Sequence, residues 1–301
     1  MPTSVDEVIA RIPGWKDDPA LRVTPLGGGI TNHNFRIDTR GESFVLRVPG
    51  EGTDQLGIDR RAERAANEAA AAIDIAPQVV RFLEPDGYLV TRFIDGRTVA
   101  AEEIGRPEMI RRVAEALRAF HARPRIPGSF SAFQVVRDYS AAAQRLGVVF
   151  PPDFDQLKRS LDDVESHLPQ DPPCPCHNDL LNANFLESGG RLYILDWEYA
   201  GMGDATFDLA NFSRNHDFTV EQDAVLLDAY AGRASAARLA RLRLMRVASD
   251  MREAMWGLLQ SGVSRLDFDF RGYAERHFQR AAEGIGDPHW RTWLKEAVHG
   301  I

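Results

Sequence analysis

The sequence predicts an α+β protein of two lobes, a small lobe of antiparallel strands with one helix and a larger, mainly helical lobe. The chain has 301 residues, more than one small core usually organises. Its first ninety or so residues alternate short apolar runs with turn residues, whereas apolar residues further on recur every three or four positions. Asp95-Gly96 separates the two patterns, so we expect lobes at residues 1–95 and 96–301.

The first lobe is expected to carry strands joined by short turns. Strands are predicted at residues 23–26, 30–37, 44–48, 79–83 and 88–94. A glycine loop is expected at residues 27–29, a tight turn at 39–41 and a helix at 59–73. Because side chains alternate across a strand, Arg47 lies on the opposite face from Leu46 and Val48. An arginine in that position needs a negatively charged partner for its guanidinium group.

The second lobe shows helical periodicity in several stretches. Apolar residues step by three and four over residues 110–120 and 154–168, and residues 239–260 and 273–282 are expected to be further helices. Arg238, Arg241, Arg243 and Arg246 are most simply interpreted as a solvated helix face. In the segment 172–209, polar residues surround two short predicted strands.

Composition excludes several classes of function. The 36 basic and 44 acidic residues give a net charge of −8, so we expect no nucleic-acid partner. No apolar stretch is long enough to span a membrane and the N-terminus is too acidic for a signal peptide, so we expect a soluble cytoplasmic protein without membrane insertion. Two thiols, Cys174 and Cys176, do not complete a structural zinc site and are expected to stay reduced.

Residues 177–186 and 193–198 carry the most specific signal in the chain. Asp179 and Asn184 lie on a short loop, and Asp196 follows a predicted strand. One or two carboxylates and an amide oxygen are what Mg²⁺ held against phosphate oxygens requires. The alternative is that these residues only cap and turn a β-hairpin.

The glycine run at residues 27–29 is compared with known phosphate-binding loops. It lacks the Lys-Ser/Thr of a P-loop, and Asn32 stands where the dinucleotide fingerprint has its last glycine. A loop between two strands fits a flap over nucleotide phosphates instead. Backbone N–H groups of Gly28 and Gly29, with the side chains of Thr31 and Asn32, are the expected phosphate contacts.

Together these motifs resemble the H-x-D-x-x-x-x-N catalytic loop and metal-binding Asp of the aminoglycoside phosphotransferase and choline kinase group, which has a protein-kinase-like fold. Residues 27–35 and 196–210 are most similar to the choline/ethanolamine kinase branch, and the resemblance spans about residues 25–280. It implies that Asp179 orients the substrate hydroxyl and accepts its proton, and that Asn184 and Asp196 bind the metal. Glu198 matches a further acidic position near the metal, with a surface carboxylate as the alternative.

The resemblance also implies how a nucleotide is held. Arg47 stands where the fold carries its phosphate-contacting lysine, with Glu63 as its partner on the helix and Glu68 as the alternative partner. The backbone of the segment that joins the lobes is expected to meet the adenine. That segment includes Arg92, Phe93 and Ile94.

For the substrate, Trp256 and Tyr273 resemble positions that surround the quaternary ammonium in choline kinases. Core packing is the alternative for both aromatic residues, and His121 is interpreted as a structural histidine. The predicted function is ATP- and Mg²⁺-dependent phosphorylation of a small amino alcohol, choline first and ethanolamine second. The alternatives are another hydroxyl acceptor, such as an aminoglycoside, a sugar or an amino-acid alcohol, or a catalytically inactive nucleotide-binding protein. The oligomeric state stays open.

Overall fold

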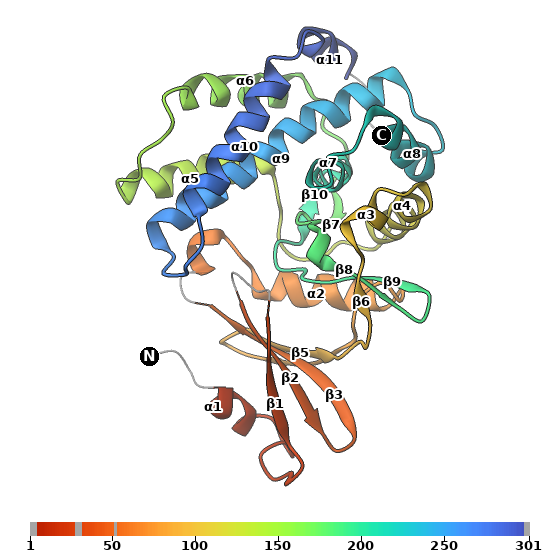
Figure 1. Ribbon diagram of the computed structural model, residues 1–301, viewed down its shortest axis with the longest axis vertical. Coiled ribbons are helices and arrows are strands. Elements are labelled where there is room, and N and C mark those ends of the chain that lie inside the picture. The colour runs from red at the N-terminus through yellow and green to blue at the C-terminus, as the bar shows by residue number, and fades with distance from the viewer. Residues whose placement is uncertain (1–4, 28–31, 51–52, 298–301) are drawn as a thin grey trace.

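The computed structural model describes residues 5–27, 32–50 and 53–297 and confirms the α+β fold. Figure 1 shows a sheet at one end of the molecule, a helical part at the other, and α2 (Arg60–Ala71) where they meet. The sheet is antiparallel, with the strand order β1-β2-β3-β5-β4. In that order the strands are Arg22–Leu26, Asn32–Thr39, Glu42–Pro49, Tyr88–Arg92 and Val79–Leu83.

The tight turn predicted between the second and third strands joins β2 to β3. Arg40 and Gly41 have positive φ angles of 52° and 76°, and the flanking Thr39 and Glu42 pair with each other. A two-residue turn of this kind twists in the same sense as the strands that it connects. The turn therefore sets the register that brings Arg47 to the inner end of the sheet.

The apolar core has two parts, and the first lies on one face of the sheet. Ile37, Leu46 and Val90 come from three strands and pack with Val8 from α1 (Val5–Ala10). The sequence analysis did not predict this helix. Six residues are too few for a stable isolated helix, so α1 depends on burying its apolar side chains in this cluster.

The second part of the core fills the helical half and extends to α2. Asp59 caps this helix by accepting the N–H groups of Arg61 and Ala62. Ala66 and Ala70 are one turn apart and are completely buried in the larger cluster. α2 therefore packs against the helical part, although its sequence neighbours belong to the sheet.

The helical part is organised around one long helix, α9 (Ala236–Val263), which packs against α5, α7, α10 and α11. The other helices are α3 (Ala101–Ile104), α4 (Pro107–His121), α5 (Ala132–Arg145), α6 (Phe154–His167), α7 (Ala205–Asn215), α8 (Val220–Ala231), α10 (Phe270–Ile285) and α11 (Trp290–Glu296). Two small antiparallel sheets carry the functional segment. They are β6-β8-β9 (Arg97–Thr98, Phe185–Ser188, Arg191–Ile194) and β10-β7 (Gly201–Gly203, Cys174–Cys176).

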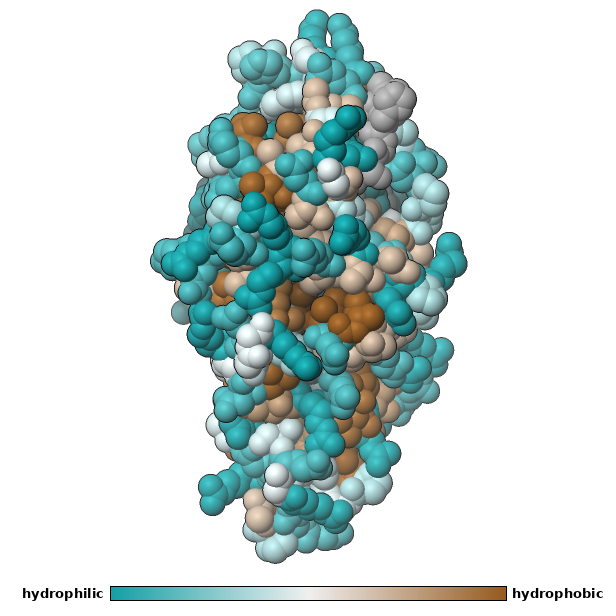
Figure 2. Space-filling model, turned by 90° about the vertical axis from the view of Figure 1, so that its right-hand side faces the viewer, coloured by the Kyte–Doolittle hydropathy of each residue, from teal (hydrophilic) through white to brown (hydrophobic). Residues whose placement is uncertain are grey.

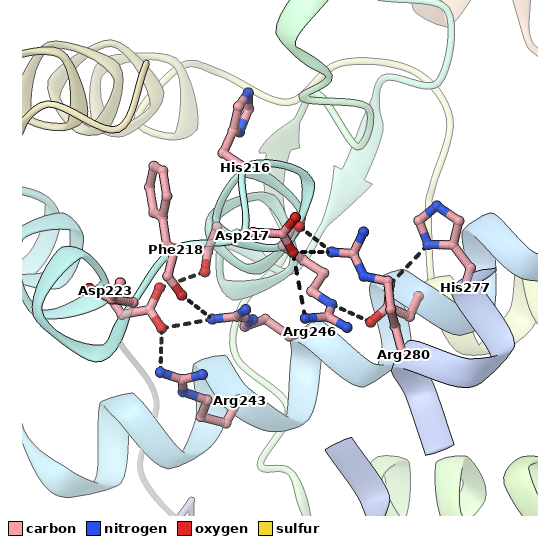
Figure 3. A network of polar contacts seen from close by, with 12 residues as sticks. His216, Asp217, Phe218, Asp223, Arg243, Arg246, His277 and Arg280 are labelled. Atoms are coloured by element: carbon pink, nitrogen blue, oxygen red, sulfur yellow. Dashed lines mark hydrogen bonds and ion pairs between the residues drawn. The ribbon is translucent and has the colours of Figure 1, made fainter. Parts of the chain in front are cut away.

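The prediction of a solvated arginine face on α9 is wrong for two of its residues. Arg241 is fully buried, and Arg246 is 7% exposed. Figure 3 shows Arg243 and Arg246 directed at Asp223 of α8, at 2.9 and 3.0 Å. The periodicity of α9 alone could not reveal this, because the carboxylates that pair with these arginines come from other segments of the chain.

The surface of the molecule is mainly polar on the face drawn in Figure 2. Apolar side chains gather across the middle of this face, near the level at which the sheet meets the helical part. Within the described ranges, no helix combines the length and the apolar character needed to cross a membrane.

Candidate active site

The predicted catalytic loop follows β7, and α7 holds it in place. The carboxylate of Asp208 accepts the N–H groups of His177 and Asn178 at 2.7 and 2.6 Å. Asn211, three residues further along α7, accepts the N–H of Leu180 at 2.6 Å. Residues three apart share one helix face, so a single face of α7 fixes the loop. Asp208 lies within residues 196–210, which resemble the choline/ethanolamine kinase branch, but no role was predicted for it.

His177 supports the loop and has the contacts of a neutral structural histidine. Its Nε2 lies 2.9 Å from the carbonyl oxygen of Leu195, and its Nδ1 accepts the N–H of Asp179 at 3.2 Å. Burial lowers the pKa of His177. Both ring nitrogens are therefore engaged within the loop region.

Asp179 is buried beside an arginine that the sequence analysis did not single out. Its Oδ1 lies 3.4 Å from Nη1 of Arg252 in α9. Burial raises the pKa of Asp179 well above its ordinary value, and Arg252 opposes this shift. The charges of Glu253, Asp196 and Glu198 raise it further. A base accepts a proton most effectively when its pKa is close to the working pH.

Asn184 and Asp196 come together at the end of β9. The side-chain amide of Asn184 donates to the carbonyl oxygen of Asp179 at 2.8 Å, and its backbone carbonyl accepts the N–H of Leu195 at 2.8 Å. Asp196 has a positive φ of 61°, a conformation that non-glycine residues adopt mainly where the surroundings enforce it. Its Oδ1 lies 2.8 Å from Nη1 of Arg47.

Arg47 on β3 pairs with Glu63 on α2, the first of the two predicted partners. Both side chains are buried. Glu68 lies instead on the exposed face of α2, where its Oε1 is 3.6 Å from Nε of Arg64. Five residues turn a helix by about 500°, so Glu63 and Glu68 cannot face the same neighbour.

Glu198 is buried, which excludes the alternative of a surface carboxylate. Its Oε2 accepts a hydrogen bond from Nδ2 of Asn32 at 2.8 Å and lies 3.3 Å from Nη1 of Arg60. Arg60 also donates to Oδ1 of Asn32 at 2.9 Å. Asn32, predicted to contact nucleotide phosphates, is thus held by protein groups and connects β2 to the acidic cluster.

A cavity of about 480 Å³ lies between the sheet and the catalytic loop, within the size range of ligand pockets. The predicted site residues in its walls are Arg47, Arg92, Phe93, Ile94, Asn184 and Asp196. The N–H of Phe93 donates to the carbonyl oxygen of Ser43, whereas the backbone of Ile94 makes no hydrogen bond to another described residue. The side chain of Arg92 pairs with Glu42. Gly28, Gly29 and Thr31 lie outside the described residues.

A second cavity, of about 910 Å³, has Glu198 in its wall, two residues after Asp196 in the chain. Its walls include Tyr139 and Tyr199 together with the carboxylates of Asp59 and Asp138. Aromatic faces and carboxylates both attract a cation. This cavity therefore suits a small positively charged molecule.

Trp256 and Tyr273 lie together, with ring centroids 5.5 Å apart at an angle of 72°. Nε1 of Trp256 donates to the hydroxyl of Tyr199 at 3.1 Å, and the hydroxyl of Tyr273 donates to Glu253 at 2.8 Å. Neither Trp256 nor Tyr273 lines the two cavities described above. Tyr199 is the member of this aromatic group that reaches the second cavity.

Arg252 connects the aromatic group to the catalytic loop. Its guanidinium lies 4.3 Å from the ring centroid of Tyr199 and 2.5 Å from Oε1 of Glu253. It precedes Trp256 by four residues, so the two share one face of α9. That spacing was the one signal in the sequence, because Asp179 and Tyr199, which Arg252 contacts, come from distant segments.

The acidic cluster fits a divalent metal ion. Burial raises the pKa of Asp196 to about 6, and the nearby charge of Glu198 adds to the shift. A bound cation would relieve this repulsion, and Mg²⁺ takes carboxylate and amide oxygens as ligands. Asp196, Glu198 and the amide oxygen of Asn184 are the groups that could hold it.

Known proteins share both the sequence and the fold. The phosphotransferase enzyme family matches residues 22–244. A crystal structure of a choline/ethanolamine kinase family protein from Mesorhizobium loti is 31% identical, with a TM-score of 0.82 and 97% of each chain covered. Probable choline kinase 2 of Arabidopsis thaliana is 25% identical, covering 93% of this chain and 91% of that protein.

Protein LicA of Haemophilus influenzae is 27% identical over 207 residues. This match covers 67% of the present chain and 61% of LicA, less than two thirds of its length. The family match covers well over half of the chain, and the Mesorhizobium loti protein aligns along almost all of it. The resemblance found in the motifs is therefore confirmed, and the chain belongs to the phosphotransferase enzyme family and, within it, to the choline/ethanolamine kinase family.

Proposed function

We propose that this protein is an ATP- and Mg²⁺-dependent kinase that phosphorylates the hydroxyl group of a small amino alcohol, choline first and ethanolamine second. The observation that carries the proposal is the cluster of buried Asp179 and Asn184 with partly exposed Asp196. Asn184 and Asp196 line the cavity beside the sheet, and Glu198 lines the second cavity. The names of the relatives, choline and ethanolamine kinases, support the same class of acceptor.

In the proposed reaction the hydroxyl oxygen of the acceptor attacks the γ-phosphorus of ATP, and the bond between that phosphorus and the ADP oxygen breaks. The hydroxyl proton passes to the carboxylate of Asp179, whose raised pKa suits it as an acceptor. Arg47, anchored by Glu63, supplies positive charge for the phosphates. Asn184, Asp196 and Glu198 would hold Mg²⁺, which when bound offsets negative charge on the phosphate oxygens.

We assign the ammonium group of the acceptor to the second cavity. Tyr139 and Tyr199 offer aromatic faces there, each of which contributes about 0.5–2 kcal/mol to binding a cation, depending on desolvation. Glu198 supplies a compensating charge. Trp256 and Tyr273 complete the proposed substrate set, Trp256 through its hydrogen bond to Tyr199.

The proposal is tested by measuring ADP release from purified protein with Mg-ATP and a panel of acceptors. The panel contains choline, ethanolamine, sugar alcohols and aminoglycosides, and Asp179→Asn serves as the blank. We expect selective turnover of choline, weaker turnover of ethanolamine and no turnover when EDTA is in excess. Turnover of other acceptors alone would reject the amino alcohol. Tight nucleotide binding without turnover of any acceptor would reject the enzyme.

A further inference from the structure

A second group of metal-ligand residue types lies where β7 meets the end of α4. Cys174 and Cys176 occupy alternate positions of β7 and so face the same side, and His121 is the last residue of α4. One ligand atom of each residue lies within 4.8 Å of the other two. Figure 1 shows α4 beside α8 in the helical part, and α4 also contacts β7. This group contains none of the proposed nucleotide or magnesium residues.

The two sulfur atoms already have the spacing of thiolates on one metal ion. The Sγ atoms of Cys174 and Cys176 are 3.7 Å apart. Zinc binds thiolate sulfur at about 2.3 Å with tetrahedral geometry, which places two sulfur ligands about 3.8 Å apart.

His121 has the surroundings typical of a metal-binding histidine. Its Nε2 lies 3.0 Å from the carboxylate of Asp208, and its Nδ1 lies 2.8 Å from the hydroxyl of Tyr230 in α8. Metal-binding histidines almost always donate their second ring N–H to a carboxylate or carbonyl group. With its proton on Nε2, His121 offers the lone pair of Nδ1 to a metal, and the Tyr230 oxygen lies beside it.

We propose that Cys174, Cys176 and Nδ1 of His121 bind a thiophilic divalent cation such as Zn²⁺, with the Tyr230 hydroxyl oxygen in the fourth position. The sequence alone shows two thiols, too few for such a site, and the fold adds the nitrogen and the oxygen. Sulfur and nitrogen donors select Zn²⁺ over Mg²⁺, so this site does not compete for the ion proposed at Asp196. Cys174 is only partly buried, which leaves an approach for the ion.

The site adjoins the catalytic loop through one residue. Asp208, the partner of His121, also accepts the backbone N–H groups of His177 and Asn178. A bound ion would therefore connect α4, β7 and α8 at the base of this loop. Because an ion that binds only the folded chain stabilises it, occupancy should raise the melting temperature. This inference does not depend on the identity of the acceptor.

The experiment uses the fact that the chain contains only two cysteines, so every thiol signal reports on this site. Reduced full-length protein is freed of metal with a chelator and titrated with Zn²⁺. We expect one Zn²⁺ per chain, loss of reactivity of both thiols towards a chromogenic thiol reagent, and a higher melting temperature. Titration with Co²⁺ should give thiolate-to-cobalt charge-transfer absorption.

Variants distinguish the proposed ligands from other residues. Cys174→Ser should weaken Zn²⁺ binding by at least about tenfold and reduce the charge-transfer absorption. It replaces a partly buried residue, and circular dichroism checks that the variant folds. Tyr230→Phe removes only the hydroxyl and should weaken binding less than Cys174→Ser does. Asp196→Asn, at the magnesium cluster, is the matched control and should leave Zn²⁺ affinity unchanged.

Three results would overturn the proposal. The thiols could stay fully reactive with Zn²⁺ in excess over protein, or Co²⁺ could bind without charge-transfer absorption. Folded Cys174→Ser could also bind Zn²⁺ as tightly as the unaltered protein. Each result can be obtained whether or not the protein phosphorylates an amino alcohol, so failure of this site and failure of the kinase proposal are separate outcomes.

Discussion

The protein contains two groups of clustered arginines and carboxylates, and the groups differ in which kind of charged residue is in excess. The first joins α7, α8, α9 and α10 and is seen in Figure 3. It contains four arginines and one histidine against three aspartates: Arg214, Arg243, Arg246, Arg280, His277, Asp217, Asp223 and Asp250. The second is the active-site cluster, with five carboxylates against three arginines: Asp179, Asp196, Glu198, Glu63, Glu253, Arg47, Arg60 and Arg252.

The charges around individual carboxylates show what this difference means. Burial raises the pKa of Asp223, but the charges close to it, Arg246 and Arg243, all lower it. At Asp196 burial raises the pKa and the like charge of Glu198 raises it again, although Arg47 and Arg60 oppose the shift. Strongly shifted carboxylates with like-charged neighbours are typical of functional sites. We therefore expect the helix network to contribute to stability, whereas the active-site cluster has the charges of the cation and proton site that we propose.

Asp179→Asn should show the largest effect and separates the two groups most clearly. Removing the proton acceptor should lower kcat by about 10²–10⁴-fold. The melting temperature should stay the same or rise, because one of several mutually repelling carboxylates becomes neutral. Steady-state kinetics and thermal unfolding of the same preparation check both parts. Retention of most of the activity would show that Asp179 does not accept the proton.

Asp250→Asn should have the opposite effect, loss of stability without loss of chemistry. Asp250 is buried and contacts Arg214, Arg280 and His277, which would all lose this buried carboxylate. Breaking a buried ion pair costs about 3–5 kcal/mol, which urea unfolding would measure as a lower free energy of unfolding. The control is Asp217→Asn, whose side chain is 74% exposed and whose loss should cost less than about 1 kcal/mol. Equal losses for both variants would contradict the structural role of this network.

The sequence predicted local features of the active site better than its long-range partners. Asp179, Asn184 and Asp196 lie within eighteen residues in one short-range motif, and the structure brings them together. The resemblance implied Glu63 as the partner of Arg47, with Glu68 as the alternative, and the structure pairs Arg47 with Glu63. The α+β fold followed from the change of periodicity near residue 95, since strands and helices repeat differently.

What the sequence could not show depends on contacts between distant segments. Asp208 and Arg252 reach the catalytic loop from α7 and α9, and no local pattern shows that they contact this loop. Arg241 was expected in solvent but is buried, because Asp204 lies against it. α1 was not predicted because six residues have only a weak tendency to form a helix. It forms because the sheet covers its apolar side.

Glu198→Gln sharpens the account of the active-site cluster. If Glu198 helps to hold Mg²⁺, neutralising it should raise the Mg²⁺ concentration needed for half-maximal activity by about 10–100-fold. Activity is measured against Mg²⁺ concentration at saturating ATP. Glu68→Gln, a change on the exposed face of α2, is the control and should leave the curve unchanged. An unchanged curve for Glu198→Gln would mean that Glu198 does not help to hold Mg²⁺ and only binds Asn32 and Arg60.

The smallest and most selective effect is expected in the pH profile of kcat/KM. Asp179 must be ionised to accept a proton, so activity falls as the pH drops through its raised pKa. Arg252 lowers that pKa and Glu253 raises it. Arg252→Met should therefore move the acid limb to higher pH and Glu253→Gln should move it to lower pH, each by about one unit.

Opposite shifts from adjacent residues on one helix separate an electrostatic role from a packing role. A disturbance of packing would lower activity at every pH and leave the midpoint of the limb where it was. Arg252→Lys keeps the charge but loses the planar fork. Compared with Arg252→Met, it should bring the midpoint pH of the acid limb most of the way back to that of the unaltered protein but recover less of kcat. Lys reproduces the charge that acts on Asp179 but not the contacts of Arg252 with Tyr199 and Glu253. If both single variants moved the limb in the same direction, the charge balance of this cluster would not set the proton affinity of Asp179.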